Sequence, residues 1–294
     1  MNLGYYPGCS AEGTGKEADL SLKEVFKVLD IGLDELEDWS CCGATSAHVT
    51  SHLLSVALPA RNLLLAQKQG LNELLAPCAA CYSRLVSSQK EMRLDEKTRM
   101  RVEELLEDKM NTGMKICNLL QVFEEIGPEK LKDHITADLK NLKVACYYGC
   151  LLVRPADIAL ADDVEDPHSM EAIVEATGAK TVNWNFKTEC CGAAHSIAHT
   201  DIVVKLSKKI LDDAIKRGAD VIAVACPMCH SNLDMRQIAI IDQDKGRNPI
   251  PVLYLTELIG LAMGIDPAAL GINSHYIDVK PILSKITKRE VVCA

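Results

Sequence analysis

The chain has 294 residues, 48% of them hydrophobic and 25% charged, with a formal net charge of −9 and only three Phe and two Trp. The negative charge disfavours nucleic acids and anionic membranes as partners, and so few large aromatic side chains leave little for stacking against bases. No apolar run approaches the ~20 residues that cross a bilayer, and no basic segment followed by an apolar core opens the chain, so we expect a cytoplasmic protein.

Thirteen cysteines set this composition apart. In a cytoplasmic chain, disulfides are disfavoured and an enrichment in cysteine points to metal or redox chemistry. The spacing of the cysteines distinguishes these kinds of site.

The first half of the chain places its cysteines after short apolar runs. A strand is predicted at Leu3–Tyr6 and another at Leu74–Ala76, each ending at a loop with cysteines. Between them lie the motif "WSCCGA", residues 39–44, and a helical stretch at Leu53–Lys68. Two further predictions complete this half: an exposed helix at Glu91–Met110 and a closing segment "KICNLLQVFEEIG", residues 115–127.

The second half repeats this order. "YYGC" matches the earlier "YYPGC", "CCGA" recurs, and a predicted strand at Val221–Ala225 again precedes a C-x-x-C pair. A helix at Ile202–Lys216 ends before Gly218, and "IPVLYLTELIGLAMG", residues 250–264, matches the first closing segment. We place residues 1–140 in one module and 141–294, with a C-terminal tail, in a second.

Alternating strands and helices predict an α/β fold class with two pseudo-symmetric modules. Each module has a small, mainly parallel sheet flanked by helices, with its cysteines at the carboxyl ends of the strands. Ten cysteines fall in the repeat, five in each half: Cys9, Cys41, Cys42, Cys78 and Cys81, then Cys150, Cys190, Cys191, Cys226 and Cys229. Cys117, Cys146 and Cys293 lie outside the repeated motifs, and we assign them no ligand role.

Five thiols with an adjacent pair suit a cluster of several irons better than a single zinc ion. Neighbouring residues do not easily direct both sulfurs at one tetrahedral ion, whereas they can bind different irons. Two other interpretations explain fewer of the residues. The string Cys226–His230 matches a haem attachment site but has Tyr82 in place of the histidine in the first repeat, and a thiol-exchange pair at Cys78 and Cys81 leaves three cysteines per module unused.

The doubled arrangement resembles the CCG, or cysteine-rich, domain family, and within it the B subunits of heterodisulfide reductases of methanogenic archaea. The resemblance implies one noncubane [4Fe-4S] cluster per module, held by the five cysteines named above. It also implies a small-molecule substrate, the mixed disulfide of coenzyme M and coenzyme B, which is reduced to two thiols.

The same resemblance implies partner proteins. The chain has neither a cubane-ferredoxin cysteine run nor a G-x-G-x-x-G fingerprint, so electrons must arrive from another polypeptide. In the family this is a small ferredoxin-like subunit, which is fed by a flavoprotein subunit, with a hydrogenase or formate dehydrogenase as the electron source.

Residues beside the cysteine motifs are candidates for the remaining tasks. Arg154 and Lys187 are candidate ligands for the anionic groups of the substrate, by proximity alone. Three histidines that follow the CC pairs are candidate proton donors: His48, His195 and His199.

Two other functions stay open. CCG domains also resemble electron-transfer subunits of anaerobic glycerol-phosphate, lactate or succinate–quinone enzymes, in which the chain would pass electrons without binding a disulfide. A noncatalytic scaffold stabilised by zinc is the alternative from outside redox chemistry.

Overall fold

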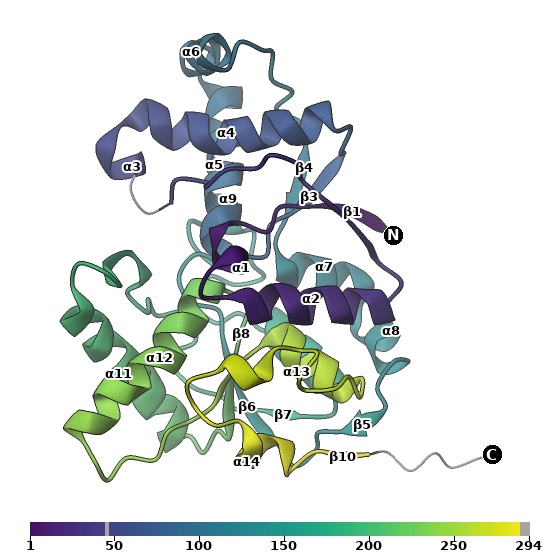
Figure 1. Ribbon diagram of the computed structural model, residues 1–294, viewed down its shortest axis with the longest axis vertical. Coiled ribbons are helices and arrows are strands. Elements are labelled where there is room, and N and C mark those ends of the chain that lie inside the picture. Colours follow the sequence, from purple (N-terminus) through teal and green to yellow (C-terminus); the bar gives the residue numbers. More distant parts are fainter. Residues whose placement is uncertain (45–46, 289–294) are drawn as a thin grey trace.

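Two four-stranded parallel sheets form the framework of the molecule (Figure 1). The structure is a computed structural model that describes residues 1–44 and 47–288. The first sheet contains β1 (Asn2–Tyr5), β2 (Gly32–Glu35), β3 (Glu73–Leu75) and β4 (Lys115–Cys117). The second contains β6 (Lys143–Tyr147), β7 (Lys180–Thr181), β8 (Val221–Val224) and β9 (Val252–Tyr254).

Both sheets have the same strand order, β2-β1-β3-β4 and β7-β6-β8-β9, and all their pairs are parallel. The predicted α/β fold class with two repeated parallel modules is therefore confirmed. In each sheet the first strand lies between the second and the third, so the three loops that carry the cysteines leave from one edge. Ligands of open α/β sheets bind at such an edge. The predicted boundary between residues 140 and 141 stays a prediction.

The inner strands are apolar because helices cover both faces of each sheet. All four residues of β8 are buried, as are four of the five in β6. The helices that follow the cysteine loops are the longest: α2 (Lys16–Val28), α4 (His52–Lys68), α5 (Ala79–Leu94), α11 (Thr200–Lys216) and α12 (Pro227–Gln243).

The shorter elements link these layers. They are α1 (Cys9–Glu12), α3 (Ala47–Thr50), α6 (Glu96–Leu106), α7 (Leu119–Ile126), α8 (Pro128–Lys132), α9 (Ala156–Ala159), α10 (Ser169–Ala176), α13 (Leu255–Ala262), α14 (Lys280–Leu283) and the 3-10 turns η1 (Ala193–His195) and η2 (Ile272–Ser274). A two-stranded antiparallel sheet pairs β5 (Ala137–Asp138) with β10 (Thr287–Lys288).

One predicted helix is wrong. The segment Glu91–Met110 is not a single helix, because α5 runs on to Leu94 and α6 begins at Glu96. Asp95 separates them with an extended backbone, and its carboxylate accepts a hydrogen bond from the amide of Lys97 at 2.9 Å. An aspartate that caps a new helix therefore interrupts a run of helix-forming residues.

The two modules meet through α2 of the first and α13 of the second, which lie side by side in Figure 1. The hydroxyls of Ser21 and Thr256 are 2.6 Å apart in this contact, and both residues are buried. Leu22 and Leu255 belong to the same buried cluster. Among the described residues, no helix is both long enough and apolar enough to span a membrane.

Candidate functional site: two facing sets of cysteines

The loops after β1, β2 and β3 bring the cysteines of the first module together. The Sγ atoms of Cys42 and Cys81 lie 3.4 Å apart, and the amide of Gly43 donates a hydrogen bond to Cys41 Sγ at 3.4 Å. Cys9 and Cys41 are exposed, whereas Cys42, Cys78 and Cys81 are buried. Residues that are far apart in the sequence thus form one group of thiols.

The second module repeats this arrangement after β6, β7 and β8. Cys191 Sγ lies 3.7 Å from Cys229 Sγ, and the amide of Gly192 donates a hydrogen bond to Cys190 Sγ at 3.3 Å. Cys150 is half-buried and its thiol hydrogen-bonds to Cys190. All ten cysteines of the two sets are free thiols rather than disulfides.

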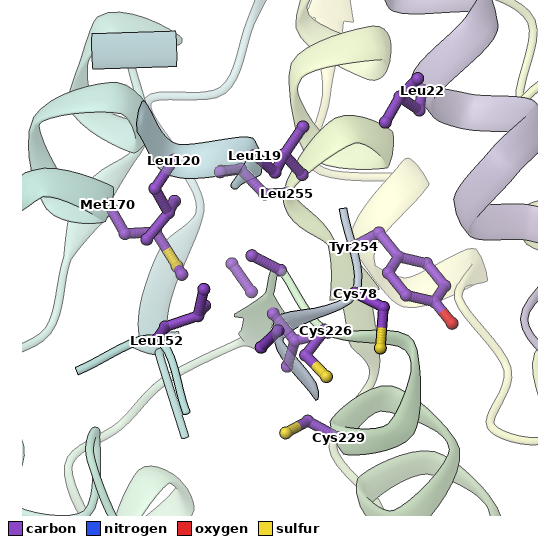
Figure 2. Close-up of a cluster of buried hydrophobic side chains, with 14 of the residues drawn as sticks. Leu22, Cys78, Leu119, Leu120, Leu152, Met170, Cys226, Cys229, Tyr254 and Leu255 are labelled. Atoms are coloured by element: carbon purple, nitrogen blue, oxygen red, sulfur yellow. The ribbon is translucent and has the colours of Figure 1, made fainter. Parts of the chain in front are cut away.

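The two sets touch each other through the C-x-x-C motifs. Cys78 and Cys226 are the N-cap residues of α5 and α12, and their thiols hydrogen-bond across the module boundary. The amide of Ala79 also points at Cys226 Sγ. Figure 2 shows Cys78 beside Cys226 and Cys229. The hydrogen bonds from Cys229 and then from Cys78 lower the pKa of Cys226, whereas the hydrogen bond with Cys226 raises the pKa of Cys78.

Glycines allow the backbone to approach these thiols. Gly8 and Gly149 have φ of +71° and +66°, a region that disfavours residues with a side chain. A Cβ at either position would lie 3.0 Å from a cysteine sulfur, Cys81 Sγ in the first module and Cys229 Sγ in the second.

Two tyrosines hold the CC loops in place. Tyr6 donates a hydrogen bond to the carbonyl of Ser40 at 2.7 Å, and Tyr147 donates one to the carbonyl of Glu189 at 2.6 Å. Each accepting residue directly precedes a CC pair. Burial, and then the nearby thiolates, raise the pKa of both phenols, so they stay protonated and act as hydrogen-bond donors.

A hydrogen bond between two thiols lowers the pKa of one and raises the pKa of the other, as between Cys42 and Cys41. The hydrogen bond from Cys41, followed by that from Cys81, lowers the pKa of Cys42. The hydrogen bond from Cys150 lowers the pKa of Cys190, and backbone amides of Gly192 and Ala193 act in the same direction. In each set these hydrogen bonds favour the thiolate, the form that binds metals, at one thiol: Cys42 in the first and Cys190 in the second.

The chemistry of this donor set fits an iron–sulfur cluster in each module. Five free thiols converge at one edge of each sheet, backbone amides point at their sulfurs, and the glycine at the end of the first loop leaves room beside them. The two cysteine sets are consistent with the iron–sulfur binding of CCG domains.

A cavity of about 270 Å³ lies beside the second set of cysteines, at the boundary with the first module. Cys150, Cys190, Cys191, Cys226 and Cys229 line it from the second module, with Tyr148, Leu151, Ala193, Ala194 and Met228, and Ala44, Ala79, Ala80 and Arg84 line it from the first. Apart from the thiols, Arg84 is the only charged side chain among the described residues that line this space. The cavity therefore combines apolar walls, cysteine sulfurs and a single cation.

The structure places the two predicted anion ligands away from this cavity. The Lys187 ammonium is buried in ion pairs with Asp166 at 2.7 Å and Glu171 at 3.0 Å, so its charge is already neutralised. Arg154 pairs with Glu165 at 2.8 Å on the surface. Neither residue lines this cavity, so the geometry does not support the role that proximity in sequence suggested for them.

The candidate proton donors are exposed where the structure describes them. His195 follows Ala194, which lines the cavity, and its charge favours the thiolate of Cys190. The rings of His195 and His199 lie 5.7 Å apart between centroids. The side chain of His48 lies outside the described part of the structure.

The cysteines without an assigned role lie in the sheets. Cys117 ends β4 and Cys146 lies within β6, both buried and neither in the two sets. Cys293 lies outside the described residues.

Sequence reasoning missed Arg84 and the two tyrosines. Arg84 lies three residues after Cys81, so it shares a helical face with that cysteine, and this spacing was the available signal. Tyr6 and Tyr147 lie in the repeated "YY" context, which by itself indicates only duplication.

Comparisons with known proteins match both repeats of the chain. The family described as CCG, a cysteine-rich domain, matches residues 3–86 and 144–234, together more than half of the chain. The 8-methylmenaquinol:fumarate reductase membrane anchor subunit of Wolinella succinogenes is 33% identical over 93% of this chain and 96% of its own length. The B subunit of the ferredoxin:CoB-CoM heterodisulfide reductase of Methanosarcina mazei is 32% identical over 97% and 96% of the two chains.

Two further similarities extend the comparison. A protein of Archaeoglobus profundus that is named as similar to the heterodisulfide reductase B subunit is 30% identical over 91% of this chain and 92% of its own. A crystal structure of a hypothetical protein from Helicobacter pylori matches with a TM-score of 0.73 and 13% identity, over 94% of this chain and 51% of that one, which is a likeness of fold alone. With both repeats matched, the chain belongs to the CCG family of cysteine-rich domain proteins, as its doubled motif predicts, and is related to the B subunits of heterodisulfide reductases.

Proposed function

We propose that this chain is the catalytic subunit of a heterodisulfide reductase, in which a small disulfide is reduced to two thiols between two noncubane [4Fe-4S] clusters. The proposed ligands are the five cysteines of each set, and residues 1–140 and 141–294 are the two modules that carry them. The proposed substrate is the mixed disulfide of coenzyme M and coenzyme B.

The cavity beside the second cysteine set, which the first module closes with apolar residues and Arg84, carries this proposal. A cluster held by the five cysteines of the second set takes up part of this space, so the apolar wall of the first module and Arg84 are the features that a protein which only relays electrons does not need. Here a cavity of about 270 Å³ has one wall of cysteines from the second module and another from the start of α5 in the first. The names of three relatives that share the repeat point to the same chemistry.

The side chains around the cavity have distinct tasks in this proposal. When bound, the clusters supply the two electrons one at a time and offer Lewis-acidic iron to sulfur. Ala79, Ala80 and Leu151 receive the apolar chain of the disulfide and exclude water, and the Arg84 guanidinium holds an anionic end group. His195, exposed beside the Cys190 loop, protonates the released thiolates.

Electrons reach the clusters from other polypeptides in this proposal. The relatives are named as subunits of larger enzymes. The proposed partners are a ferredoxin-like subunit, which passes electrons to this chain, and a flavoprotein subunit that supplies it. A hydrogenase or formate dehydrogenase is the proposed source, and the proposed location is the cytoplasm.

An anaerobic assay of the purified complex tests the proposal. Reduced viologen is supplied as the electron donor, and consumption of coenzyme M–coenzyme B disulfide is measured as the appearance of two thiols per two electrons. We expect turnover that depends on Cys229. A preparation with full iron content that reduces neither this disulfide nor other small disulfides would overturn the proposal.

A second candidate is an electron-relay role in a fumarate reductase. The observation that favours it is the 33% identity to the anchor subunit of the Wolinella succinogenes enzyme. The relay predicts co-purification with a flavoprotein that reduces fumarate, and it predicts unchanged fumarate reduction when Arg84 is replaced by glutamine. The disulfide reductase predicts that no fumarate-reducing flavoprotein co-purifies, and that Arg84→Gln weakens the reduction of an anionic disulfide.

A further inference from the structure

A second group of potential metal ligands lies behind the cysteines, between the two modules. His230 follows Cys229 on α12, Glu257 lies in the first turn of α13, and His275 follows η2. Their ligand atoms lie within 4.8 Å of one another. The side chains of His230, Glu257 and His275 are 3%, 0% and 1% exposed.

Hydrogen bonds leave a nitrogen of each imidazole ring open for a metal. His230 Nε2 donates to the carbonyl of Val252 at 3.0 Å, so its lone pair is on Nδ1, which lies 3.8 Å from Glu17 Oε1. His275 Nε2 lies 2.8 Å from Glu257 Oε1, while its buried Nδ1 makes no hydrogen bond. Hydrogen bonding within the protein therefore does not satisfy this buried polar group.

We propose that His230, Glu257 and His275 bind one zinc ion, with Glu17 as a fourth ligand from the first module. A tetrahedral ion with bonds of about 2.0 Å holds its ligand atoms about 3.3 Å apart, so the ligand atoms of His230, Glu257 and His275 move together by up to about 1.5 Å on binding. Two imidazoles with carboxylates suit zinc, whereas magnesium and calcium prefer ligand sets made of oxygen.

The surroundings support a cation at this place. Two carboxylates, those of Glu17 and Glu257, are 10% and 0% exposed, and buried carboxylates need a cation close by. A cavity of about 220 Å³ lined by Glu17, His230 and Asp234 adjoins the group and gives an ion a route inward. Asp234 also accepts hydrogen bonds from the amides of Tyr276 and Ile277, which anchors the segment that carries His275.

The position of the ligands gives the ion a structural role. They come from α2 of the first module and from α12, α13 and the C-terminal segment of the second. One ion then joins four segments directly behind Cys226 and Cys229, and it fixes the relative placement of the modules on which the cavity depends. This role is independent of which disulfide, if any, the cavity accepts.

X-ray absorption at the zinc edge tests the site in the full chain, purified anaerobically with its iron and given one equivalent of zinc before desalting. We expect one retained zinc per chain with a shell of nitrogen and oxygen at about 2.0 Å and no sulfur at about 2.3 Å. His275→Ala and Glu257→Gln should each lose this zinc at unchanged iron content, and their melting temperatures should no longer rise on zinc addition. The control is His168→Ala, which changes an exposed histidine outside the group and should keep the zinc.

Three results would overturn the site. They are wild-type protein that retains no zinc, zinc bound through sulfur, and zinc that both variants retain. Should the variants fail to fold, the wild-type spectrum decides alone, because a sulfur shell places the ion on the cysteines. Loss of disulfide reduction with the zinc signal intact would count against the proposed function and not against this site.

Discussion

In the proposed reaction, Arg84 is the residue on which the choice of substrate depends. It is the only charged side chain, apart from the thiols, among the described residues around the cavity. A guanidinium in an apolar cavity binds an anionic group through charge-assisted hydrogen bonds, each of which contributes about 1.5–3 kcal/mol. We therefore expect Arg84→Gln to lower kcat/KM for an anionic disulfide by roughly 10- to 100-fold and to leave a neutral disulfide of similar size nearly unaffected.

The comparison variant is Arg154→Gln. Because Arg154 pairs with Glu165 outside the cavity, this change should alter kcat/KM less than about twofold. If Arg154→Gln proved the more damaging of the two with the anionic substrate, the sequence-based prediction for Arg154 would be right and the cavity-based one wrong.

The division of the cysteines into ligands and core residues is also tested at single residues. Cys229→Ala removes one of five thiols that converge in the second module, so we expect a loss of about half of the bound iron, since two equivalent sets are present. Cys117→Ala is the matched control, because Cys117 is also buried but ends a strand of the first sheet. Iron and acid-labile sulfide are measured after anaerobic purification, and equal iron in the two variants would contradict the assignment.

At the scale of the elements, the turns between strand and helix decide where the thiols lie. Gly149 and Gly218 have φ of +66° and +77°, so an alanine costs roughly 1–2 kcal/mol of backbone energy at either position. Only at Gly149 would the added Cβ meet a cysteine, Cys229 Sγ at 3.0 Å, whereas nothing lies within 4 Å at Gly218.

Alanine at Gly218 therefore adds backbone strain alone, whereas alanine at Gly149 adds the same strain and also a contact with Cys229. Gly149→Ala and Gly218→Ala should lower the free energy of unfolding of the iron-free protein, and Gly149→Ala should lower it more. Only Gly149→Ala should reduce the iron content. Measuring both quantities in both variants checks this, and a normal iron content in Gly149→Ala would show that the turn adapts without moving Cys229.

The elements themselves could largely be predicted from the sequence. The predicted strand at Val221–Ala225 matches β8, and the predicted helix at Ile202–Lys216 matches α11, because apolar runs and helical periodicity report burial directly. The break at Asp95 was missed because a capping aspartate resembles any exposed acidic residue of a helix. The gathering of each cysteine set followed from the parallel strands, which end at one edge of each sheet.

At the scale of the whole molecule, prediction from the sequence reached its limit. The duplication predicts two similar modules, but spacing within a module says nothing about how the two pack. The contact between Cys78 and Cys226, the cavity with Arg84 and the group around His275 all depend on that packing. Lys187 shows the same limit, because its ion pairs form with Asp166 and Glu171, which are far in the sequence from the CC motif that suggested a role for it.

The packing of the modules depends in part on the hydrogen bond between Ser21 and Thr256, at 2.6 Å in the contact of α2 with α13. The Ser21 hydroxyl also lies 3.3 Å from the carbonyl of Ala18 and can donate there, which leaves Thr256 as the donor to Ser21. Ser21→Ala then leaves a buried hydroxyl donor without an acceptor and should lower the free energy of unfolding by about 1–3 kcal/mol. Thr256→Val should cost less, because it removes the donor.

A double-mutant cycle isolates this contact. In Ser21→Ala/Thr256→Val neither group is left unpaired, so the double variant should lose less stability than the two single variants together, with a coupling of about 1 kcal/mol. Urea unfolding of the reduced, iron-free chain gives the free energy of unfolding of the wild type, the two single variants and the double variant. Each module is monitored with its own probe, because two modules need not unfold together. Additive losses would mean that α2 and α13 are held together by apolar packing alone, and the hydrogen bond would then have no part in aligning the two cysteine sets.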